Sequence, residues 1–301
     1  MNTKQLEYVR VLSIEGSFSK AADTLNITQP SLSQYIKKIE TEVGLPLFER
    51  TGGNVRLTDA GRVYLESGKR ILDLEHQMNA KIRDIAENKS GSLVIGTSPF
   101  RSAGMMPEIA KRFRGLYPGM HLVIEERETG ALIEGTEHGE FDFCLSLLPV
   151  DEHIFAWEKV MEEEIVLAVP SSFAPLPSVK AGNRKYDAVD AKMLNGLSLV
   201  MISETQVMQR ALDNLCRDLD IRVGKAAVVK SLSAQVAMVR AGVGAALVPT
   251  GIERFCAEGE VRFYSFIQEL PRREVAAIWR KDRYLSEAAQ ALIEGIKKIN
   301  W

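Results

Sequence analysis

The stretch SFSKAADTLNITQPSLSQYIKKIE, from Ser17 to Glu40, carries two helical patterns separated by a short polar break. In the second pattern three apolar residues, Leu32, Ile36 and Ile39, stand at i, i+4 and i+7, which predicts one buried stripe. The helix should begin near Thr28, because threonine is a good N-cap. Two helices joined by a turn of about three or four residues form a helix-turn-helix, and the second helix meets base edges in the DNA major groove.

The first helix and the turn carry residues that let the two helices approach closely. Ala21 and Ala22 are small and face inward together with Phe18 and Leu25. Asn26 tolerates the left-handed backbone that a tight turn needs. The pattern therefore predicts two helices packed on one core.

The exposed side of the second helix is rich in side chains that suit base edges and phosphates. Gln can pair with adenine through two hydrogen bonds, Ser can bond bases or phosphates, and Lys neutralises phosphate. Two arginines flank a Gly-Gly turn, as a wing that grips the DNA backbone requires. The residues predicted to contact DNA are Thr28, Gln29, Pro30, Ser31, Ser33, Gln34, Lys37, Lys38, Arg50 and Arg56.

The charge balance leaves an alternative open. The chain has a formal net charge of −2, so it has no general attraction to nucleic acid or to membranes. Basic and acidic residues also nearly balance up to Arg62. Any DNA site must be a local patch, and a small helical subdomain with a solvated polar face fits the same pattern.

A long helical pattern follows, which Thr58 caps and which reaches about Glu87. Its apolar residues follow heptad positions, although Ser67 and Lys81 interrupt the row at d. The absence of Gly and Pro after Gly68 favours a dimerising helix, and a core helix packed on its own domain is the alternative. The residues predicted to form the dimer are Tyr64, Ile71, Leu74, Met78 and Ile85.

Beyond a linker at residues 88–91, strand and helix patterns alternate along the chain. They include the strand SLVIGTS, a helix PEIAKRFRGLYP from Pro107, and the strand HLVIEERE. Such alternation predicts parallel α/β sheets, and the number of strands suits two small sheets better than one large one. A chain of 301 residues with 46% hydrophobic residues can bury such cores.

Several classes of protein do not fit the sequence. Cys144, Cys216 and Cys256 lie far apart, which argues against a disulfide framework or a zinc site. No apolar run is long enough to span a bilayer and no signal core begins the chain, so we expect the cytoplasm and no membrane partner. GxSxG, HExxH and P-loop motifs are missing, and the histidines show no metal spacing. We expect no enzyme activity, no cofactor and no metal.

The run FSKAADTLNITQPSLSQYIKKIETEVGLPLFER, followed by LTDAG, carries the motifs of one regulator family. Through its A-A, Q-P-S-L-S, I-x-x-I-E, G-x-x-L-F-x-R and L-T-x-A-G elements, the segment 1–87 resembles the N-terminal region of LysR-type transcriptional regulators. There are two departures. Gln34 stands where many members have Arg, and the turn at residues 51–54 has no basic residue.

The resemblance implies an α/β fold with an all-α N-terminal part. It implies a winged helix-turn-helix, a long linker helix, and an effector domain of two periplasmic-binding-protein-like α/β subdomains. In that domain HGEFDFCLSLL is similar to the family's G-x-x-D stretch, and AGVGAALVPTG to its G-x-G-x-x-x-x-P stretch. The expected divisions are 1–58 for the DNA-binding domain, 59–89 for the linker helix and 90–301 for the effector domain, with subdomain I at about 90–161 and 268–301 and subdomain II at about 162–267.

The resemblance also implies a sequence-specific, DNA-binding transcriptional regulator that is controlled by a small molecule bound between the two subdomains. The expected partners are double-stranded DNA, RNA polymerase, further copies of the chain in a homodimer or homotetramer, and a small-molecule effector for which a carboxylate is one candidate. An enzyme or a solute-binding protein on the same α/β fold is the alternative, but a free-standing solute receptor would lack the DNA-binding head.

The effector should lie at the carboxyl ends of parallel strands, where helix N-termini point at a ligand. Four segments rich in hydroxyl groups reach that place, and hydroxyls can bond a carboxylate or a hydroxyl group. The same Ser and Thr side chains would also serve as ordinary helix N-caps. The residues predicted to bind the effector are Thr97, Ser98, Arg101, Ser102, Thr129, Ile202, Ser203, Ser231 and Ser233.

A thiol redox sensor is a third class, because the LysR-type family includes a peroxide-sensing member. The resemblance aligns Cys216 with the resolving cysteine of that member and Val207 with its peroxide-reactive one. A lone thiol cannot close an intramolecular disulfide. Cys144 lies in an apolar strand and has the pattern of a core residue. We therefore reject the redox function.

Overall fold

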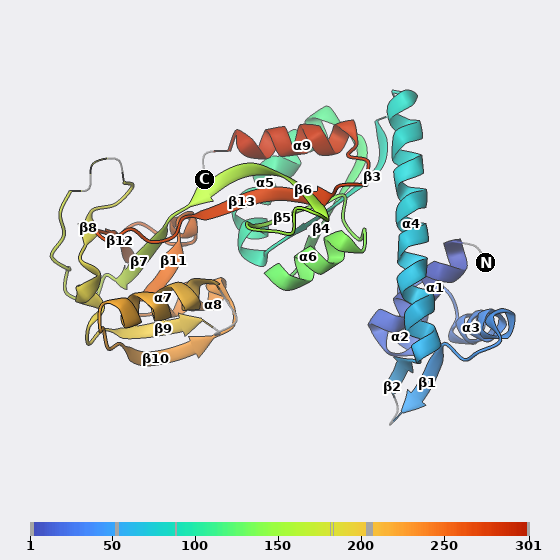
Figure 1. Ribbon diagram of the computed structural model, residues 1–301, viewed down its shortest axis with the longest axis horizontal. Coiled ribbons are helices and arrows are strands. Elements are labelled where there is room, and N and C mark those ends of the chain that lie inside the picture. Colours follow the sequence, from blue (N-terminus) through green and yellow to red (C-terminus); the bar gives the residue numbers. More distant parts are fainter. Residues whose placement is uncertain are drawn as a thin grey trace.

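The computed structural model describes residues 3–51, 54–87, 89–180, 182, 184–202 and 207–299. Figure 1 shows helix α4 (Asp59–Ile85) upright at one side, with the N-terminal helices around its lower end. The α/β part of the chain lies on the other side of α4 as two bodies, here called subdomain I, next to α4, and subdomain II, farther away (Figure 1). The chain thus consists of an N-terminal unit, a long helix and two subdomains.

The N-terminal unit is a helix-turn-helix with a two-stranded wing. It consists of α1 (Thr3–Glu15), α2 (Phe18–Thr24) and α3 (Gln29–Val43), followed by the antiparallel strands β1 (Phe48–Thr51) and β2 (Asn54–Leu57). The predicted stripe of α3 is buried against Val9 and Leu12 of α1 and the two alanines of α2. The sequence therefore predicted this unit correctly.

The turn between α2 and α3 has the predicted geometry. Asn26 adopts a positive φ of 53°, and the backbone N–H of Ile27 donates to Ala22 O over 3.0 Å. The Oγ1 of Thr28 accepts from the backbone N–H of Ser31 over 3.4 Å and so caps α3. Small side chains and a capped start fix the direction in which α3 leaves the turn.

The wing is fixed to the helices by backbone contacts. The backbone N–H of Val55 donates to Gly16 O over 3.0 Å, and the hydroxyl of Thr58 donates to Pro46 O over 2.7 Å. A Cβ at Gly61 would stand 2.0 Å from Leu47 O, so only glycine lets α4 pass this close to the strand that enters the wing. The wing, α3 and the start of α4 therefore form one rigid unit.

Subdomain I is a five-stranded sheet with helices on its faces. The sheet has the order β4-β3-β5-β13-β6, in which β3 is parallel to β4 and β5, whereas β13 is antiparallel to both of its neighbours. Its elements are β3 (Ser90–Thr97), α5 (Pro99–Leu116), β4 (Gly119–Glu126), α6 (Thr129–Glu137), β5 (Phe143–Leu147), β6 (Phe155–Glu163), β13 (Arg273–Arg280) and α9 (Glu287–Lys297).

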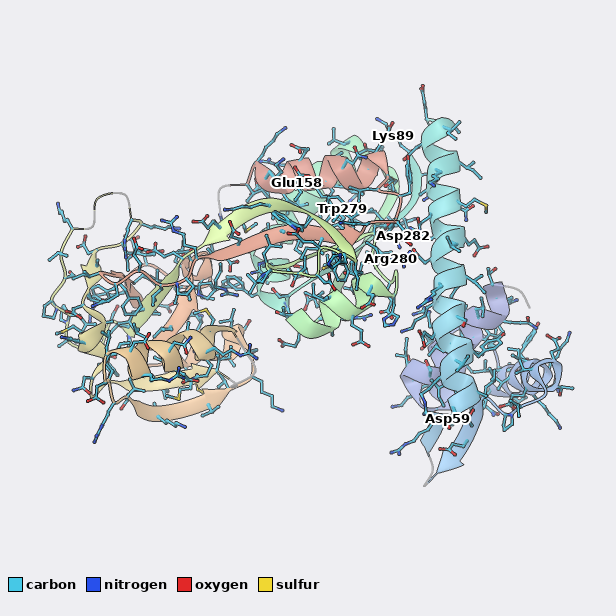
Figure 2. All side chains as sticks on the ribbon, in the orientation of Figure 1. Asp59, Lys89, Glu158, Trp279, Arg280 and Asp282 are labelled. Atoms are coloured by element: carbon cyan, nitrogen blue, oxygen red, sulfur yellow. The ribbon has the colours of Figure 1, made fainter. Side chains whose placement is uncertain are left out.

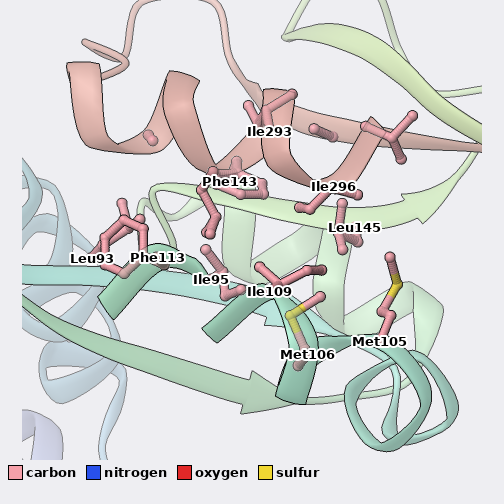
Figure 3. Close-up of a cluster of buried hydrophobic side chains, with 14 of the residues drawn as sticks. Leu93, Ile95, Met105, Met106, Ile109, Phe113, Phe143, Leu145, Ile293 and Ile296 are labelled. Atoms are coloured by element: carbon pink, nitrogen blue, oxygen red, sulfur yellow. The ribbon is translucent and has the colours of Figure 1, made fainter. Parts of the chain in front are cut away.

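The core of subdomain I lies between the sheet and two helices from opposite ends of the domain. Figure 3 shows Ile293 and Ile296 of α9 facing the sheet residues Phe143 and Leu145. Met105, Met106 and Ile109 of α5 complete the same buried cluster. Burying side chains of this size stabilises the fold by about 1.5–3 kcal/mol each.

Subdomain II has one four-stranded sheet, β11-β7-β12-β8, and one parallel pair, β10-β9. An isolated parallel bridge between Leu199 and Ala245 connects the two. Its elements are β7 (Ile165–Pro170), β8 (Ala188–Val189), η1 (Ala191–Leu194), β9 (Ser198–Ile202), α7 (Val207–Asp218), β10 (Gly224–Val229), α8 (Leu232–Arg240), β11 (Ala246–Pro249), η2 (Ile252–Phe255) and β12 (Val261–Phe266).

Two chain segments connect the subdomains, and they correct one expectation; the start of α5 corrects another. The chain crosses from β6 to β7 and returns from β12 to β13; β6 pairs antiparallel with β13 and β7 with β12, so both sheets are mixed where the alternation of strands and helices predicted parallel sheets. The helix expected from Pro107 begins at Pro99 instead, because Ser98 caps it and Pro107 lies inside it. The two connecting segments pass close to the predicted effector site, since Glu163 ends β6 and Arg273 begins β13.

Candidate functional site

The outward face of α3 presents the side chains predicted to contact DNA. Because the apolar stripe of α3 is buried in the N-terminal unit, the polar side is left facing solvent. Thr28, Gln29, Pro30, Gln34, Lys37 and Lys38 are exposed, whereas Ser31 and Ser33 are half-buried. The acidic residues of α3, Glu40 and Glu42, stand near its C-terminal end.

Two of the predicted contact residues also serve the fold. The hydroxyls of Thr28 and Ser31 form a hydrogen bond with each other over 2.8 Å at the start of α3.

Three polar side chains form a row along α3. Gln29, Ser33 and Lys37 follow each other at intervals of about one helical turn. A row of this kind can follow a major groove, with Gln29 nearest the N-terminal end that meets base edges.

The wing places one further cation on the surface. Arg56 on β2 is exposed and lies opposite Glu49 in the β1-β2 register. The side chain of Arg50 lies outside the described residues, as do Gly52 and Gly53. Arg56 thus remains the residue of the wing that is predicted to contact the DNA backbone.

The long helix α4 has two faces with different tasks. Asp73, Gln77 and Ala80 are buried against subdomain I. Tyr64 packs on the core of the N-terminal unit. The other predicted dimer residues lie on the surface, with exposed fractions of 38% for Ile71, 63% for Leu74, 53% for Met78 and 84% for Ile85. Ile82, which the heptad pattern did not include, is also exposed, at 56%.

A small cavity of about 60 Å³ lies where the two subdomains meet. Three helix N-termini converge on it, those of α5, α6 and α8. Of the predicted effector residues it brings together Ser98, Arg101, Thr129, Ser231 and Ser233. Helix N-termini carry partial positive charge and unpaired N–H groups, which favour an anion.

Other predicted effector residues lie elsewhere. Ile202 is buried in the core of subdomain II, and Ser102 does not line the cavity. Thr97 is fully buried beside it, and its Oγ1 has no hydrogen-bond partner in the described part of the chain. Ser203 lies outside the described residues. The hydroxyls of Ser98 and Ser231 cap α5 and α8, so both residues also have the ordinary N-cap role.

Two buried arginines at the cavity share one carboxylate. Arg101 donates to Glu163 at 2.9 and 3.1 Å, and the side chains are only 5% and 0% exposed. Nη1 of Arg273 lies 3.6 Å from Oε2 of Glu163, an oxygen that Arg101 also contacts, and the Nε of Arg273 is buried without a partner in the described chain. Burial lowers the pKa of Arg273 to about 10, although Glu163 opposes the shift, so the guanidinium stays charged at neutral pH. The floor of the cavity therefore has one positive charge in excess, while Glu128 lies at its exposed rim.

Arg273 and Glu163 could not be recognised as site residues from the sequence. Both stand at the ends of the crossing strands β13 and β6, where the chain passes between the subdomains. Glu163 lies in a run of glutamates, and a buried charge has no periodic signature there. These two residues join Arg101 as the charged part of the candidate effector site.

Comparison with known proteins decides the family. Residues 86–299 match the family described as "LysR substrate binding domain", and residues 3–62 match "Bacterial regulatory helix-turn-helix protein, lysR family". The chain belongs to the LysR family of transcriptional regulators. It is a DNA-binding regulator with a substrate-binding domain, and not an enzyme.

Relatives and solved structures cover the whole of this LysR-family regulator. YcgK of Bacillus subtilis, an uncharacterized HTH-type transcriptional regulator, is 28% identical over 98% of this chain and 93% of its own length. A full-length OxyR variant from Pseudomonas aeruginosa has a TM-score of 0.72 at 24% identity, and covers 100% of this chain and 96% of its own. CbnR, solved in complex with its target DNA, has a TM-score of 0.66 at 20% identity, with 99% of each chain covered. The structural likeness shows the shared fold.

The cysteines of this LysR-family regulator have the environments of unreactive thiols. Burial raises the pKa of Cys144 to about 12, and burial also raises the pKa values of Cys216 and Cys256. A reactive thiol needs a lowered pKa, whereas burial raises the pKa of each of these three thiols. Within the described ranges no cluster of His, Cys, Asp and Glu could hold a metal, and no helix is long and apolar enough to cross a membrane.

Proposed function

We propose that this LysR-family regulator is controlled by a small anionic effector, such as a carboxylate, bound between subdomains I and II. The observation that carries the proposal is the pair Arg101 and Arg273 on one buried carboxylate, at the point where three helix N-termini meet. An incoming carboxylate would balance the excess charge and accept hydrogen bonds from the hydroxyl at Thr129 and from free helix N–H groups. A cavity of about 60 Å³ holds only a few atoms, so a larger effector requires the subdomains to move apart.

The DNA half of the proposal rests on α3 and on the exposed stripe of α4. Two copies that pair through Leu74, Met78 and Ile82 would present two α3 helices to a two-fold symmetric operator. We propose a homodimer or homotetramer on an interrupted palindrome. Effector binding would then change how the assembly recruits RNA polymerase in the cytoplasm.

A screen of ligands tests the effector class. Small carboxylates should raise the unfolding temperature of the purified protein, because a ligand that binds only the folded state stabilises it. The matched primary amides, which have the same shape without the charge, should have little effect. Equal shifts with acids and amides would contradict an anion site.

Thr129→Val tests the position of the site. Thr129 is exposed at the cavity, so the change removes a hydroxyl without disturbing the core. For a carboxylate found in the screen, the binding free energy should become less favourable by about 1 kcal/mol or more in this variant, as measured by isothermal titration calorimetry. Ser102→Ala is the matched control, because Ser102 lies on the neighbouring helix away from the cavity. If both variants bind as the unaltered protein does, the effector lies elsewhere.

Gln29→Ala tests base recognition by α3. If Gln29 contacts a base edge, its loss should weaken operator binding by about 1–3 kcal/mol and leave random DNA nearly unaffected. Lys37→Ala is the control on the same row. Because Lys37 is predicted to contact a phosphate, its loss should weaken binding to both duplexes and lower the slope of log K against log salt concentration by about one charge. Fluorescence anisotropy on operator and scrambled duplexes at several salt concentrations separates the two. Equal loss on both duplexes for Gln29→Ala would assign it to phosphate.

A further inference from the structure

The first turn of α5 packs in a different core from the rest of that helix. The core of subdomain I receives the later residues Met105, Met106, Ile109 and Phe113. Phe100, in the first turn, is only 5% exposed and packs in a cluster whose other described members all come from subdomain II. The buried members of that cluster are Val166, Ala168, Val236, Val239, Ala246, Val248 and Ile252. Helix α5 therefore places one side chain of subdomain I inside subdomain II.

The receiving part of subdomain II, here called the socket, is apolar and has an aromatic side. It consists of the cluster residues just given together with Phe255 of η2. The rings of Phe100 and Phe255 lie with their centroids 5.6 Å apart and their planes tilted by 43°. Aromatic rings bury a large apolar area and pair favourably at such a distance. The ring of Phe100 thus stabilises the closed arrangement of the two subdomains.

The contacts next to Phe100 show that its ring can leave the socket without breaking subdomain I. Arg101, the next residue, pairs with Glu163 inside subdomain I, so this pair does not depend on the socket. Nη1 of Arg273 donates to Sδ of Met208 in subdomain II over 3.1 Å, but a thioether is a weak acceptor. Of these contacts, that of Phe100 should therefore resist an opening of the subdomains most.

The same ring forms part of the wall of the cavity between the subdomains, which has a volume of about 60 Å³. The geometry points to Phe100 as a latch that holds subdomain II against subdomain I and limits what fits behind the closed latch to a few atoms. A larger effector has to draw the ring out of the socket, so the latch selects effectors by size. Only this link to an effector rests on the proposed function, because the latch itself is a property of the free chain.

Hydrogen exchange in the full-length protein measures the latch without any ligand. The amide of Ser102 in α5 donates to Ser98 O over 2.9 Å, and the amide of Gln235 in α8 donates to Ser231 O over 3.0 Å. These bonds close the first turns of two helices whose N-caps line the cavity from opposite subdomains. In Phe100→Ala both amides should exchange faster by on the order of tenfold or more, because the closed arrangement loses a buried ring.

Controls separate an opened latch from other effects of the substitution. The amides of Ala276 and Ala277, within β13 of the subdomain I sheet, should keep their rates in Phe100→Ala. Leu116→Ala makes a comparable change at an exposed position of the same helix and should alter neither set of amides. Phe255→Ala removes the partner ring from the other side, so it should accelerate the same two amides. The double variant should add little to Phe100→Ala, because the two rings act in one contact.

The latch is overturned if folded Phe100→Ala exchanges as the unaltered protein does. It is also overturned if only one of the Ser102 and Gln235 amides accelerates, which would mean local loosening, or if the β13 amides accelerate equally, which would mean general destabilisation. If Phe100→Ala does not fold, Phe255→Ala decides, since Phe255 is only half-buried, and unchanged rates there contradict the proposal. Neither operator nor effector enters the measurement, so a failure of the proposed function would leave these rates as they are.

Discussion

Glu163→Ala should destabilise subdomain I by about 3–5 kcal/mol, because it leaves two buried guanidinium groups without their carboxylate. Glu163 is the carboxylate that both Arg101 and Arg273 contact, and its side chain is fully buried. Water therefore cannot take the place of the carboxylate in the pair with Arg101. Trp157 on β6 and Trp279 on β13 lie near the other end of the same two strands, so urea titration followed by tryptophan fluorescence reports the unfolding of subdomain I. Trp279 is labelled in Figure 2.

The adjacent Glu162 supplies the control for this experiment. Its carboxylate pairs with Lys159 and Arg272 on the surface, and exposed pairs contribute at most about 1 kcal/mol. Glu162→Ala should therefore cost little, although it removes the same group one position away. Similar small losses in both variants would mean that water reaches the arginines, and the buried charge would then carry no argument for an anionic effector.

The double variant Ile71→Asp and Met78→Asp should separate the copies and lower operator affinity by on the order of 100-fold or more, because paired recognition helices are lost together. In a single chain both side chains are on the surface, at 38% and 53% exposed, so aspartates there should not disturb the fold. Sedimentation velocity should show a smaller species, and fluorescence anisotropy on the full operator should show the loss of affinity.

Asn79→Asp is the matched control for the stripe. Asn79 is exposed on the same helix next to Met78 but outside the apolar row, so one added charge there should leave mass and affinity nearly unchanged. A double variant with the mass of the unaltered protein would contradict the dimer stripe. Leu74, Met78 and Ile82 would then need another partner.

Local signals account for what the sequence predicted well. The caps at Thr28 and Thr58 and the left-handed Asn26 are each determined by residues within a few positions, and the structure confirms all three. The start of α5 was missed because Pro107 suggested a helix beginning, whereas Ser98 and Pro99 provide the actual cap and first turn.

Long-range contacts account for what the sequence could not predict. On α4 the polar Asp73 and Gln77 are buried and the apolar Leu74 is exposed, which is the reverse of the usual periodic rule. The reason is that the partners of Asp73, Arg280 and Arg283, come more than 200 positions later in the chain. Of three successive glutamates only Glu163 lies at the arginines, and no local pattern distinguishes it from its neighbours.

The position of β13 bears on how the chain is made. Because β13 lies between β5 and β6, the sheet of subdomain I has a gap until residue 280 has left the ribosome, whereas the DNA-binding unit and α4 are complete at Ile85. A premature stop codon anywhere between these points would leave a fragment that retains α3 and the pairing stripe but lacks a complete effector domain. Such fragments should compete with intact chains for operators and for each other, so truncating alleles of this regulator should interfere with the intact copy.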